Sequence, residues 1–273
     1  MDKPNFIMST VKTLKIEQDN CIICKNIDKE KNIIKITKCI AQKQINNVIL
    51  EKELYENSTF INYLNSNEIK IFDGRWLEKY LVFEFLNYII QQKSIKEEET
   101  EIAVTANEIT DLLIETIKAL SKIYKKLTVV TNHINKLRKI EREIYENEGI
   151  NIILSNNQKK SLIKPSIIVN MDFNNDVINR YKINENAIIL NLEGNVKIQN
   201  KRFNGICINN YEISIENMEK IFREDINKFN KKDLYEANIY ARDTFKNIRN
   251  KIQKDGVYIS EIYGTNGKIE RFY

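Results

Sequence analysis

Apolar residues are arranged differently in the earlier and later parts of this chain, and the change comes near residue 100. Beyond that point, short aliphatic runs alternate with longer stretches in which apolar residues recur at spacings of three and four. Unbroken runs are typical of parallel strands covered on both faces, whereas the spaced stretches are typical of amphipathic helices. The expected strands are 102–106, 127–131, 150–154, 166–170 and 187–191.

Helices are expected between these strands. One runs from about residue 107 to 125, and Thr105 followed by Glu108 predicts a capping box at its start. The next begins near Ile134 and ends before Gly149, which stands where a C-cap glycine belongs. Right-handed crossovers would place both helices on one side of the sheet. The fold class predicted here is therefore α/β, with a mostly parallel sheet that has helices on both faces.

The N-terminal part has a different pattern. Strand-like runs at 14–17, 21–24 and 33–37 are separated by polar turns, which predicts a small antiparallel meander. Helical spacing follows at 46–55 and again at 76–92, on either side of a probable strand at 69–72. The charged run 93–101 has no apolar period and marks the expected boundary to the α/β part.

The C-terminal part returns to helical spacing, at 215–229 and at 234–252. Asp233 with Glu236 three residues later predicts a capped start for the second of these helices. Asn266 and Gly267 lie between two alternating runs, which is a hairpin signal. We expect these C-terminal elements to pack back on the rest of the chain.

The composition narrows the class of protein but does not identify a function. The hydrophobic fraction of 42% and the charged fraction of 30% are ordinary for a soluble globular protein. Ile, Lys and Asn dominate, which is the residue bias of a low-GC genome and weakens any argument from lysine frequency. The net charge of +5 arises from 43 basic and 38 acidic residues that are mostly interspersed, so nucleic-acid binding is not favoured over a solvated surface.

No secretory or membrane-spanning segment is expected. The N-terminus lacks a long apolar stretch, and the most apolar segment, 80–90, is interrupted by Glu84 and Asn87. That segment is also shorter than the roughly 20 residues that span a bilayer. We therefore expect a cytoplasmic protein without membrane partners, whose cysteines are reduced.

A resemblance follows from local features of the α/β part. A strand ends at Thr131-Asn132-His133 and leads into a basic helix, and the segment 164–170 reads Lys-Pro-Ser-Ile-Ile-Val-Asn. This order resembles the Rossmann-type nucleotide-binding domain, most nearly that of shikimate-dehydrogenase-like enzymes. The resemblance implies that Thr131 and Asn132 approach the cofactor ribose, and that Asn170 ends a strand next to the cofactor, which would be NADP or NAD. Independently of this resemblance, the changes of pattern along the chain predict an α+β domain 1–95, a Rossmann-like domain 96–212 and C-terminal elements 213–273.

The chain departs from this pattern at the turn that normally grips the cofactor phosphates. That turn reads Thr105-Ala106-Asn107-Glu108, and there is no glycine between Gly74 and Gly149. Glycines there let backbone N–H groups approach the pyrophosphate, and Glu108 and Asp111 would repel it. We therefore predict no cofactor and a non-catalytic binding or regulatory role, with an unknown protein or a small polar ligand as partner. The alternative is an NAD(P)-dependent oxidoreductase of a small metabolite with an atypical cofactor loop, so the sequence does not decide whether the protein is an enzyme.

Polar residues follow several expected strands where those strands end. In a parallel sheet these ends share one edge, so their side chains would line one crevice, although asparagine also ends strands by default. Ser155, Asn156 and Asn191 belong to this wider set. The candidate cofactor-binding or ligand-binding residues are Thr105, Asn107, Thr131, Asn132, Asn170 and Asp172.

No metal site or catalytic set is predicted. Cys21 and Cys24 have the spacing of a metal knuckle, but the other candidates, Cys39, Cys207 and His133, are single and far apart in the sequence. A structural zinc site needs four ligands, so buried structural thiols are the favoured interpretation. His133 is the sole histidine, and no Gly-x-Ser-x-Gly elbow is present. Catalytic residues therefore stay unassigned.

Overall fold

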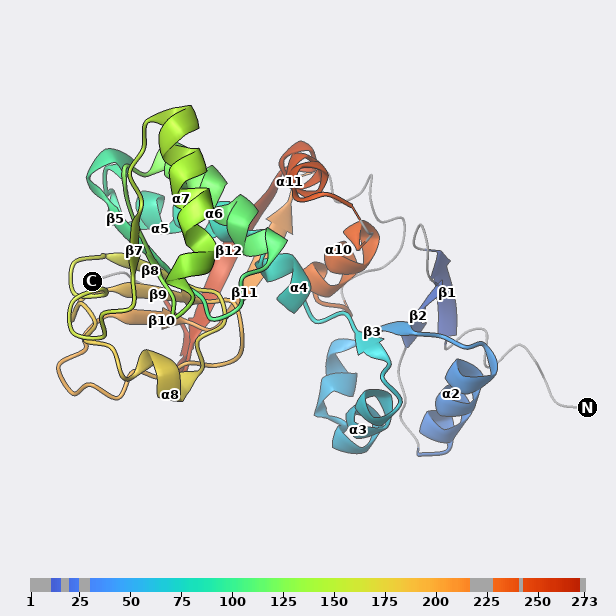
Figure 1. The fold of residues 1–273 in the computed structure, drawn as a ribbon. Coiled ribbons are helices and arrows are strands. Elements are labelled where there is room, and N and C mark those ends of the chain that lie inside the picture. Colours follow the sequence, from blue (N-terminus) through green and yellow to red (C-terminus); the bar gives the residue numbers. More distant parts are fainter. Residues whose placement is uncertain (1–10, 16–19, 25–29, 217–227, 241–242, 271–273) are drawn as a thin grey trace, which may run out of the picture. The chain divides into compact units, whose positions relative to one another are not determined.

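The computed structural model describes residues 11–15, 20–24, 30–216, 228–240 and 243–270, and it divides the chain into two compact units (Figure 1). Unit 1 contains Met1–Glu78 and Ser214–Val257, and unit 2 contains Lys79–Ile213 and Tyr258–Tyr273. The chain therefore passes between the units after Glu78, Ile213 and Val257. The domain division expected after residues 95 and 212 stays a prediction.

Unit 2 is built on a parallel sheet whose six strands lie in the order β10-β9-β8-β5-β6-β7. Counted from β5, this is the order 6-5-4-1-2-3 of a Rossmann-like sheet, so the strand order reverses between the neighbouring parallel strands β5 and β8. Most of the residues of β5, β8 and β9 are fully buried, as the unbroken aliphatic runs predict. The strands are β5 (Glu101–Thr105), β6 (Lys126–Val130), β7 (Ile153–Ser155), β8 (Ile167–Asn170), β9 (Ile188–Asn191) and β10 (Ile206–Ile208).

Helices lie on both faces of this sheet, which confirms the predicted fold class (Figure 1). Helix α6 (Asp111–Ile123) contacts β6, and α7 (Ile134–Glu148) contacts β7 and α6. On the other face, residues around the short helix α8 (Asn175–Ile178) pack with strand residues that include Ala103, Ile168 and Ile189. The remaining helical elements of unit 2 are α5 (Val82–Lys93) and the 3-10 helix η2 (Glu97–Glu99).

Two local signals near the ends of unit 2 elements are confirmed. Gly149 closes α7 in the left-handed conformation, with φ of 67°, where glycine carries no Cβ penalty. Strand β12 (Val257–Gly264) turns back into β13 (Gly267–Lys268) as an antiparallel hairpin. Strand β11 (Asn210–Ile215) completes this three-stranded sheet, and its order is β11-β12-β13.

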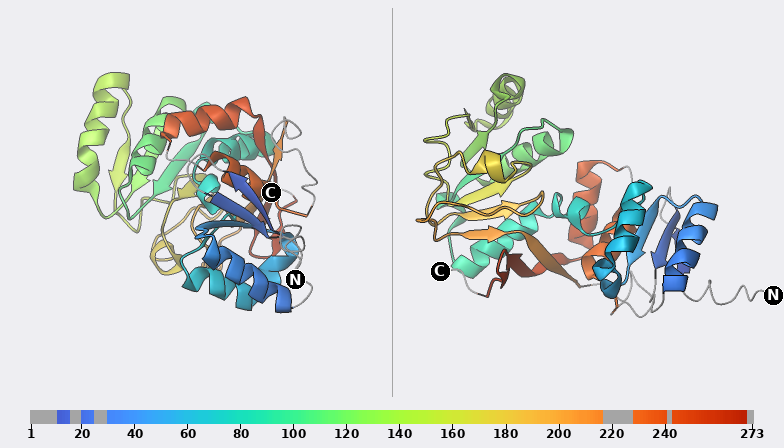
Figure 2. Two further views of the ribbon diagram at one scale, coloured as in Figure 1. Left: turned by 90° about the vertical axis from the view of Figure 1, so that its right-hand side faces the viewer. Right: turned by 90° about the horizontal axis from the view of Figure 1, so that it is seen from below.

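Unit 1 contains a four-stranded sheet in the order β1-β2-β3-β4. Only the first pair is antiparallel, so the predicted antiparallel meander is wrong for the rest of this sheet. Helices α2 and α3 pack on one face through a core that includes Ile40, Val48 and Leu64, while Ile49 faces α10 on the other (Figure 2). The elements are β1 (Val11–Lys15), β2 (Asn20–Cys24), α2 (Glu30–Gln42), β3 (Asn47–Leu50), η1 (Lys52–Glu56), α3 (Ser58–Ser66), β4 (Lys70–Ile71), α4 (Arg75–Glu78), α10 (Lys231–Ile239) and α11 (Phe245–Lys254).

The structure corrects three predicted elements in the N-terminal part. The expected strand 33–37 lies within α2, and the expected helix 46–55 is strand β3 followed by η1. Short apolar runs fit either a buried strand or a helix face, and only pairing with β2 and β4 decides for β3. The expected helix 76–92 is divided into α4 and α5, with a break before Val82.

The predicted C-terminal helices also change. The expected helix 234–252 consists of α10 and α11, which end and begin on either side of residues 240–244. Of the expected helix 215–229, Ile215 ends strand β11, and residues 217–227 lie outside the described residues. No helix in the described ranges is both long and apolar enough to cross a membrane.

Candidate functional site

The ends of β5 and β8 meet at the point where the strand order reverses. Thr105 and Asn170 are partners in the sheet register, and the Thr105 hydroxyl donates to Asn170 Oδ1 at 2.7 Å. Asn170 Nδ2 donates in turn to the Phe173 carbonyl at 2.8 Å and to Asn191 Oδ1 at 3.1 Å. The side chains of Thr105, Asn170 and Asn191 are almost completely buried, so their polar atoms depend on hydrogen bonds within the protein.

The same network continues along the edge of the sheet. Asn191 Nδ2 donates to Asn209 Oδ1 at 2.6 Å, and Asn209 Nδ2 donates to the Val196 carbonyl at 3.2 Å. The Val196 N–H returns a hydrogen bond to Asn209 Oδ1 at 3.0 Å. The amides therefore tie the ends of β8, β9 and β10 together, and their polar atoms are largely committed to the protein itself.

Asp172 follows β8 in the chain, and its side-chain carboxylate lies against the turn that follows β5. Its Oδ1 accepts the Asn107 N–H at 2.6 Å, and its Oδ2 accepts the Glu108 N–H at 2.7 Å. Two successive N–H groups that point at one anion are the arrangement with which strand–helix turns bind phosphate. In this chain the anion is a carboxylate of the protein. Asn107 and Asp172 were candidate ligand-binding residues in the sequence and Glu108 was expected to repel phosphate, but no sequence pattern indicated that these residues bond to one another.

The start of α6 corrects the predicted capping box. The helix begins at Asp111, and its N-cap is Thr110, whose hydroxyl accepts the Leu113 N–H at 3.2 Å. Thr105 does not cap it, because Thr105 ends β5 and its hydroxyl donates to Asn170 on the neighbouring strand β8. Glu108 therefore lies in the turn, outside the helix, and only Asp111 places a carboxylate in the first helical turn.

The remaining sequence-predicted residues lie one strand away, after β6. Thr131 is fully buried, and its hydroxyl accepts the His133 N–H at 3.1 Å, whereas Asn132 and His133 are exposed. Farther along the same edge, Ser155 bonds to Ser161, with 2.6 Å between their hydroxyl oxygens, and Asn156 is exposed. The structure thus pairs Thr105 with Asn170, and Asn107 with Asp172, by direct hydrogen bonds between residues at or just after the ends of β5 and β8. Their role in ligand binding stays a prediction.

The cysteines show no cluster in the described residues. Cys24 and Cys39 are buried and Cys207 is partly buried, while the side chain of Cys21 lies outside the described residues. Among the described residues, no group of three or more His, Cys, Asp and Glu side chains is placed to hold a metal ion.

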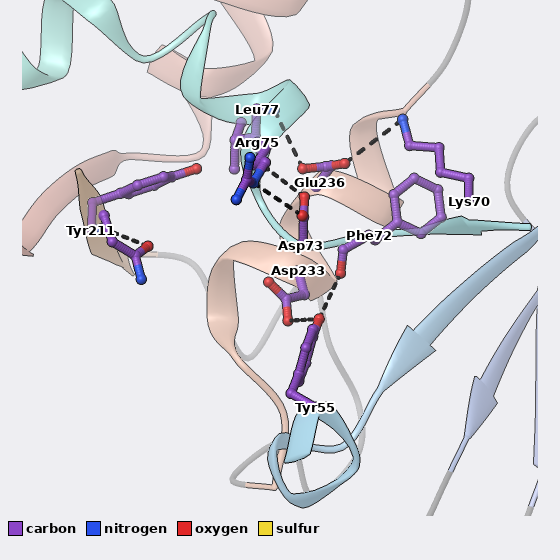
Figure 3. A network of polar contacts seen from close by, with 10 residues as sticks. Tyr55, Lys70, Phe72, Asp73, Arg75, Leu77, Tyr211, Asp233 and Glu236 are labelled. Atoms are coloured by element: carbon purple, nitrogen blue, oxygen red, sulfur yellow. Dashed lines mark hydrogen bonds and ion pairs between the residues drawn. The ribbon is translucent and has the colours of Figure 1, made fainter. Parts of the chain in front are cut away.

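Unit 1 contains a second polar network that the sequence analysis missed, shown in Figure 3. Asp233 and Glu236 lie on α10 and are both fully buried. Asp233 Oδ2 accepts the Tyr55 hydroxyl at 2.7 Å and Asn230 Nδ2 at 2.8 Å. The Tyr55 hydroxyl also lies 3.1 Å from the Phe72 carbonyl, so a single tyrosine links η1, α10 and the end of β4.

Glu236 has a weaker set of partners. Its Oε2 accepts the Leu77 N–H at 3.4 Å, and its Oε1 lies 3.8 Å from the Lys70 ammonium. That ammonium is held over the Tyr240 ring, with 3.5 Å from Nζ to the ring centroid. It is also 5.2 Å from the ring centroid of Phe72 and 5.8 Å from that of Trp76. An ammonium over aromatic faces is stabilised by cation–π attraction, so Lys70 has anionic and aromatic partners at once.

Burial dominates the electrostatics of these carboxyl groups. It raises the pKa of Asp233 to about 6, although the hydrogen bonds from Tyr55 and Asn230 favour the charged form. It raises the pKa of Glu236 to about 8, against the opposing effect of Lys70, and the nearby carboxylate of Asp73 adds to both increases. Asp233 Oδ1 and Glu236 Oε1 have no hydrogen-bond partner among the described residues. A buried carboxyl group poised near neutral pH can take up or release a proton.

From their spacing, Asp233 and Glu236 were predicted to form the capped start of a helix. The structure begins α10 at Lys231 with Asn230 as N-cap, so Asp233 and Glu236 lie inside the helix. All residues from 232 to 237 are buried, so this part of α10 has almost no solvent-exposed face, although it carries charged side chains. The spacing of three residues was visible in the sequence, but only the packing of α10 shows that both carboxyl groups leave water.

The bond between Asp172 and the turn generates a first prediction. In Asp172→Asn an NH2 group replaces one carboxylate oxygen and the negative charge is lost, so one N–H of the turn keeps only a neutral acceptor and the other faces a donor. We expect unfolding to become easier by about 1–3 kcal/mol, because hydrogen bonds to charged groups contribute that much. Hydrogen exchange of the Asn107 and Glu108 amides should accelerate, whereas Glu185→Gln, at an exposed carboxylate of the same unit, should leave both rates unchanged. Unchanged exchange in Asp172→Asn would contradict the bond.

The buried carboxyl of Glu236 generates a second prediction, on pH. Its pKa is about 8 in the folded protein and about 4.5 in the unfolded chain, so folding favours the protonated form. The stabilisation that the protonated Glu236 carboxyl gives to the folded protein is complete at pH values below its pKa in the unfolded chain. It is lost as the pH rises through its pKa in the folded protein. The free energy of unfolding of unit 1 should therefore decrease as the pH rises from about 5 to about 8. In Glu236→Gln, whose side chain cannot ionise, this free energy should decrease less over the same range.

Fluorescence of Trp76 suits this measurement, because it is the single tryptophan of the chain and lies in unit 1. Urea unfolding would be followed at several pH values in the wild type, in Glu236→Gln and in Glu56→Gln. The last variant changes an exposed carboxylate of the same unit and should follow the wild type. Parallel curves for the wild type and Glu236→Gln would refute the raised pKa.

Comparisons with known proteins add little beyond the fold. No protein-family model matches the chain, and a search of curated proteins finds no match. Among solved structures, L-tryptophan dehydrogenase from Nostoc punctiforme matches at 9% identity and a TM-score of 0.32, over 67% of this chain and 53% of that one. NAD-dependent malic enzyme from Thermotoga maritima matches at 18% identity and a TM-score of 0.31, over 61% of this chain and 47% of that one. A shikimate 5-dehydrogenase-like protein matches at 11% identity and a TM-score of 0.28, over 78% of this chain and 84% of that one.

The chain thus spans about half the length of the first two of these neighbours. Such low scores carry no functional argument, and the fold assignment depends on the strand order of the sheet itself. That order, with helices on both faces and the reversal between β5 and β8, makes unit 2 a Rossmann-like α/β structure.

Proposed function

We propose that this protein is a non-catalytic binding or regulatory protein built on a Rossmann-like scaffold that does not take a dinucleotide. The observation that carries the proposal is the carboxylate of Asp172, which accepts the N–H groups of Asn107 and Glu108. These are the groups that would otherwise hold the cofactor phosphates. The phosphate position is therefore occupied by a residue of the chain itself.

Charge and geometry both support this proposal. A pyrophosphate would have to displace a carboxylate that is tethered next to the turn, and the displaced Asp172 would then repel it. Asp111, in the first turn of α6, adds a second carboxylate near the same position. None of the residues 105–108 is glycine, so each side chain limits how closely a ligand can approach the backbone.

The polar atoms left at this edge favour a different kind of partner. The strand ends are joined by hydrogen bonds among the side chains of Thr105, Asn170 and Asn191. By contrast, Asn107 is partly exposed and Asn132 is exposed. Neutral amides of this kind suit a small polar ligand or a protein surface better than a polyphosphate. Thr131 is buried, so within this proposal it positions Asn132 and does not contact the partner.

The competing proposal is an NAD(P)-dependent oxidoreductase of a small metabolite with an atypical cofactor loop. The strand order supports it, because dinucleotides bind at the reversal point of such sheets. It requires Asp172 to leave the turn when the cofactor arrives. The two proposals therefore differ in a measurable property of the wild-type protein.

Thermal unfolding with NAD, NADP and their reduced forms separates them. A ligand at 100 times its dissociation constant stabilises a protein by about 2.7 kcal/mol, which raises the melting temperature visibly. We expect each dinucleotide to raise the melting temperature no more than an equal concentration of pyrophosphate does. A larger rise, accompanied by a change in nicotinamide fluorescence, would overturn the binding-protein proposal and favour the oxidoreductase.

A further inference from the structure

A pocket with a volume of about 420 Å³ lies on unit 2, beside β6 and β7. Glu101 and Lys126 begin β5 and β6, so this part of the pocket lies toward the amino ends of the strands. The turn that Asp172 occupies lies at the opposite, carboxyl ends. The side chains that give the pocket its charge are Lys125, Lys126, Lys160, Lys164 and Glu101, and we call it the lysine pocket.

The pocket exists because the connection from β7 to β8 lacks a helix. A parallel strand pair is usually joined by a crossover helix that covers the sheet, but residues 156–166 contain none. Thr128 and Ile153 are register partners on β6 and β7, and both line the pocket. Ile153 is 59% exposed, which is unusual for an apolar residue of a strand in this sheet.

The wall opposite these strands is fixed in place. Ser161 is buried, and its hydroxyl bonds to Ser155 at 2.6 Å and donates to the Asn157 carbonyl at 2.7 Å. The Leu162 carbonyl accepts the Asn184 N–H at 2.7 Å, and the Leu162 side chain is fully buried in the core. The backbone that carries Lys160 and Lys164 is therefore held before any ligand arrives, which lowers the entropy cost of binding.

Charge in the pocket is unbalanced. Lys126 is paired with Glu101, with 3.6 Å between Nζ and Oε1. Lys125, Lys160 and Lys164 form no ion pair with any described residue. Like charges gathered around a concave surface repel one another and attract an anion, and the local field is stronger than on a flat surface.

We propose that the lysine pocket binds a small molecule that carries a phosphate or pyrophosphate group. Several ammonium groups can surround a tetrahedral polyanion as point charges, and the Thr128 hydroxyl supplies a neutral hydrogen-bond partner. The exposed side chain of Ile153 offers an apolar contact to the rest of the ligand. The volume is in the range of small-molecule sites. This site is independent of the turn that Asp172 occupies.

Isothermal titration with pyrophosphate, and separately with tripolyphosphate, tests the proposal. The double variant Lys160→Gln/Lys164→Gln removes two of the unpaired charges, and Lys136→Gln/Lys139→Gln removes the same charge from exposed positions on α7. We expect the pocket variant to bind pyrophosphate at least tenfold more weakly than the wild type. The α7 variant should bind as the wild type does, and all proteins should unfold at similar temperatures because the changed side chains are exposed.

Several outcomes would overturn the proposal. Equal weakening in both double variants would show attraction by net charge alone, and absence of binding at millimolar pyrophosphate would remove the site. Retention of single-stranded RNA with no binding of pyrophosphate would replace the ligand class. Asp172→Asn separates this site from the turn, because its pyrophosphate affinity should equal that of the wild type. A clear gain in affinity would place the anion at the turn and contradict the lysine pocket.

Discussion

The carboxyl edge of the parallel sheet depends on one constraint, which is that polar groups taken out of water must bond to one another. Asn170 is central to meeting it, because its amide joins Thr105 on β5 to Asn191 on β9 and to the Phe173 backbone. The Phe173 N–H, bonded back to Asn170 Oδ1 at 3.0 Å, fixes the chain just after Asp172. The carboxylate of Asp172 is thereby directed into the turn after β5, where it meets two backbone N–H groups. Strand pairing, the path of the chain and the occupied turn are parts of one hydrogen-bonded arrangement.

Unit 1 handles buried polar groups differently. At the sheet edge of unit 2 the polar side chains are neutral amides that complement one another, so burial costs little once they are paired. In the polar network of unit 1 the fully buried groups are the carboxyls of Asp233 and Glu236, and burial is the largest influence on their pKa values. Lys70, held between Glu236 and the ring of Tyr240, offsets only part of that cost. A site that retains incompletely satisfied carboxyl groups costs stability, so unit 1 is the part of this protein where conditions such as pH should matter most.

Some of these features could be predicted and others could not. The strands of unit 2 were recognisable because their buried residues form unbroken aliphatic runs, and Gly149 was recognisable because α7 needs a left-handed residue at its end. The segment 33–37 was misassigned because its β-branched residues favour a strand locally, whereas Ile36 and Ile40 face a core that only tertiary packing provides. Thr105 and Glu108 matched a capping box by spacing, yet Thr105 bonds to Asn170, 65 positions away in the sequence. The spacing of residues indicates which local structures are possible, and contacts with residues far away in the sequence determine which of them forms.

The amino-acid pattern was enough to predict a mostly parallel α/β sheet, and it showed that the first strand–helix turn lacks the glycines that let a backbone approach phosphate. It also supplied the residues Asn107 and Asp172 as separate candidates. Their pairing depends on the folded chain, because the reversal of strand order places β8 next to β5 and brings Asp172 to the turn. The burial of Asp233 and Glu236 likewise depends on the folded chain, since a helix face is buried only by the elements that pack against it. Local propensity acts between neighbours in sequence, whereas charge, burial and hydrogen bonding act between neighbours in space.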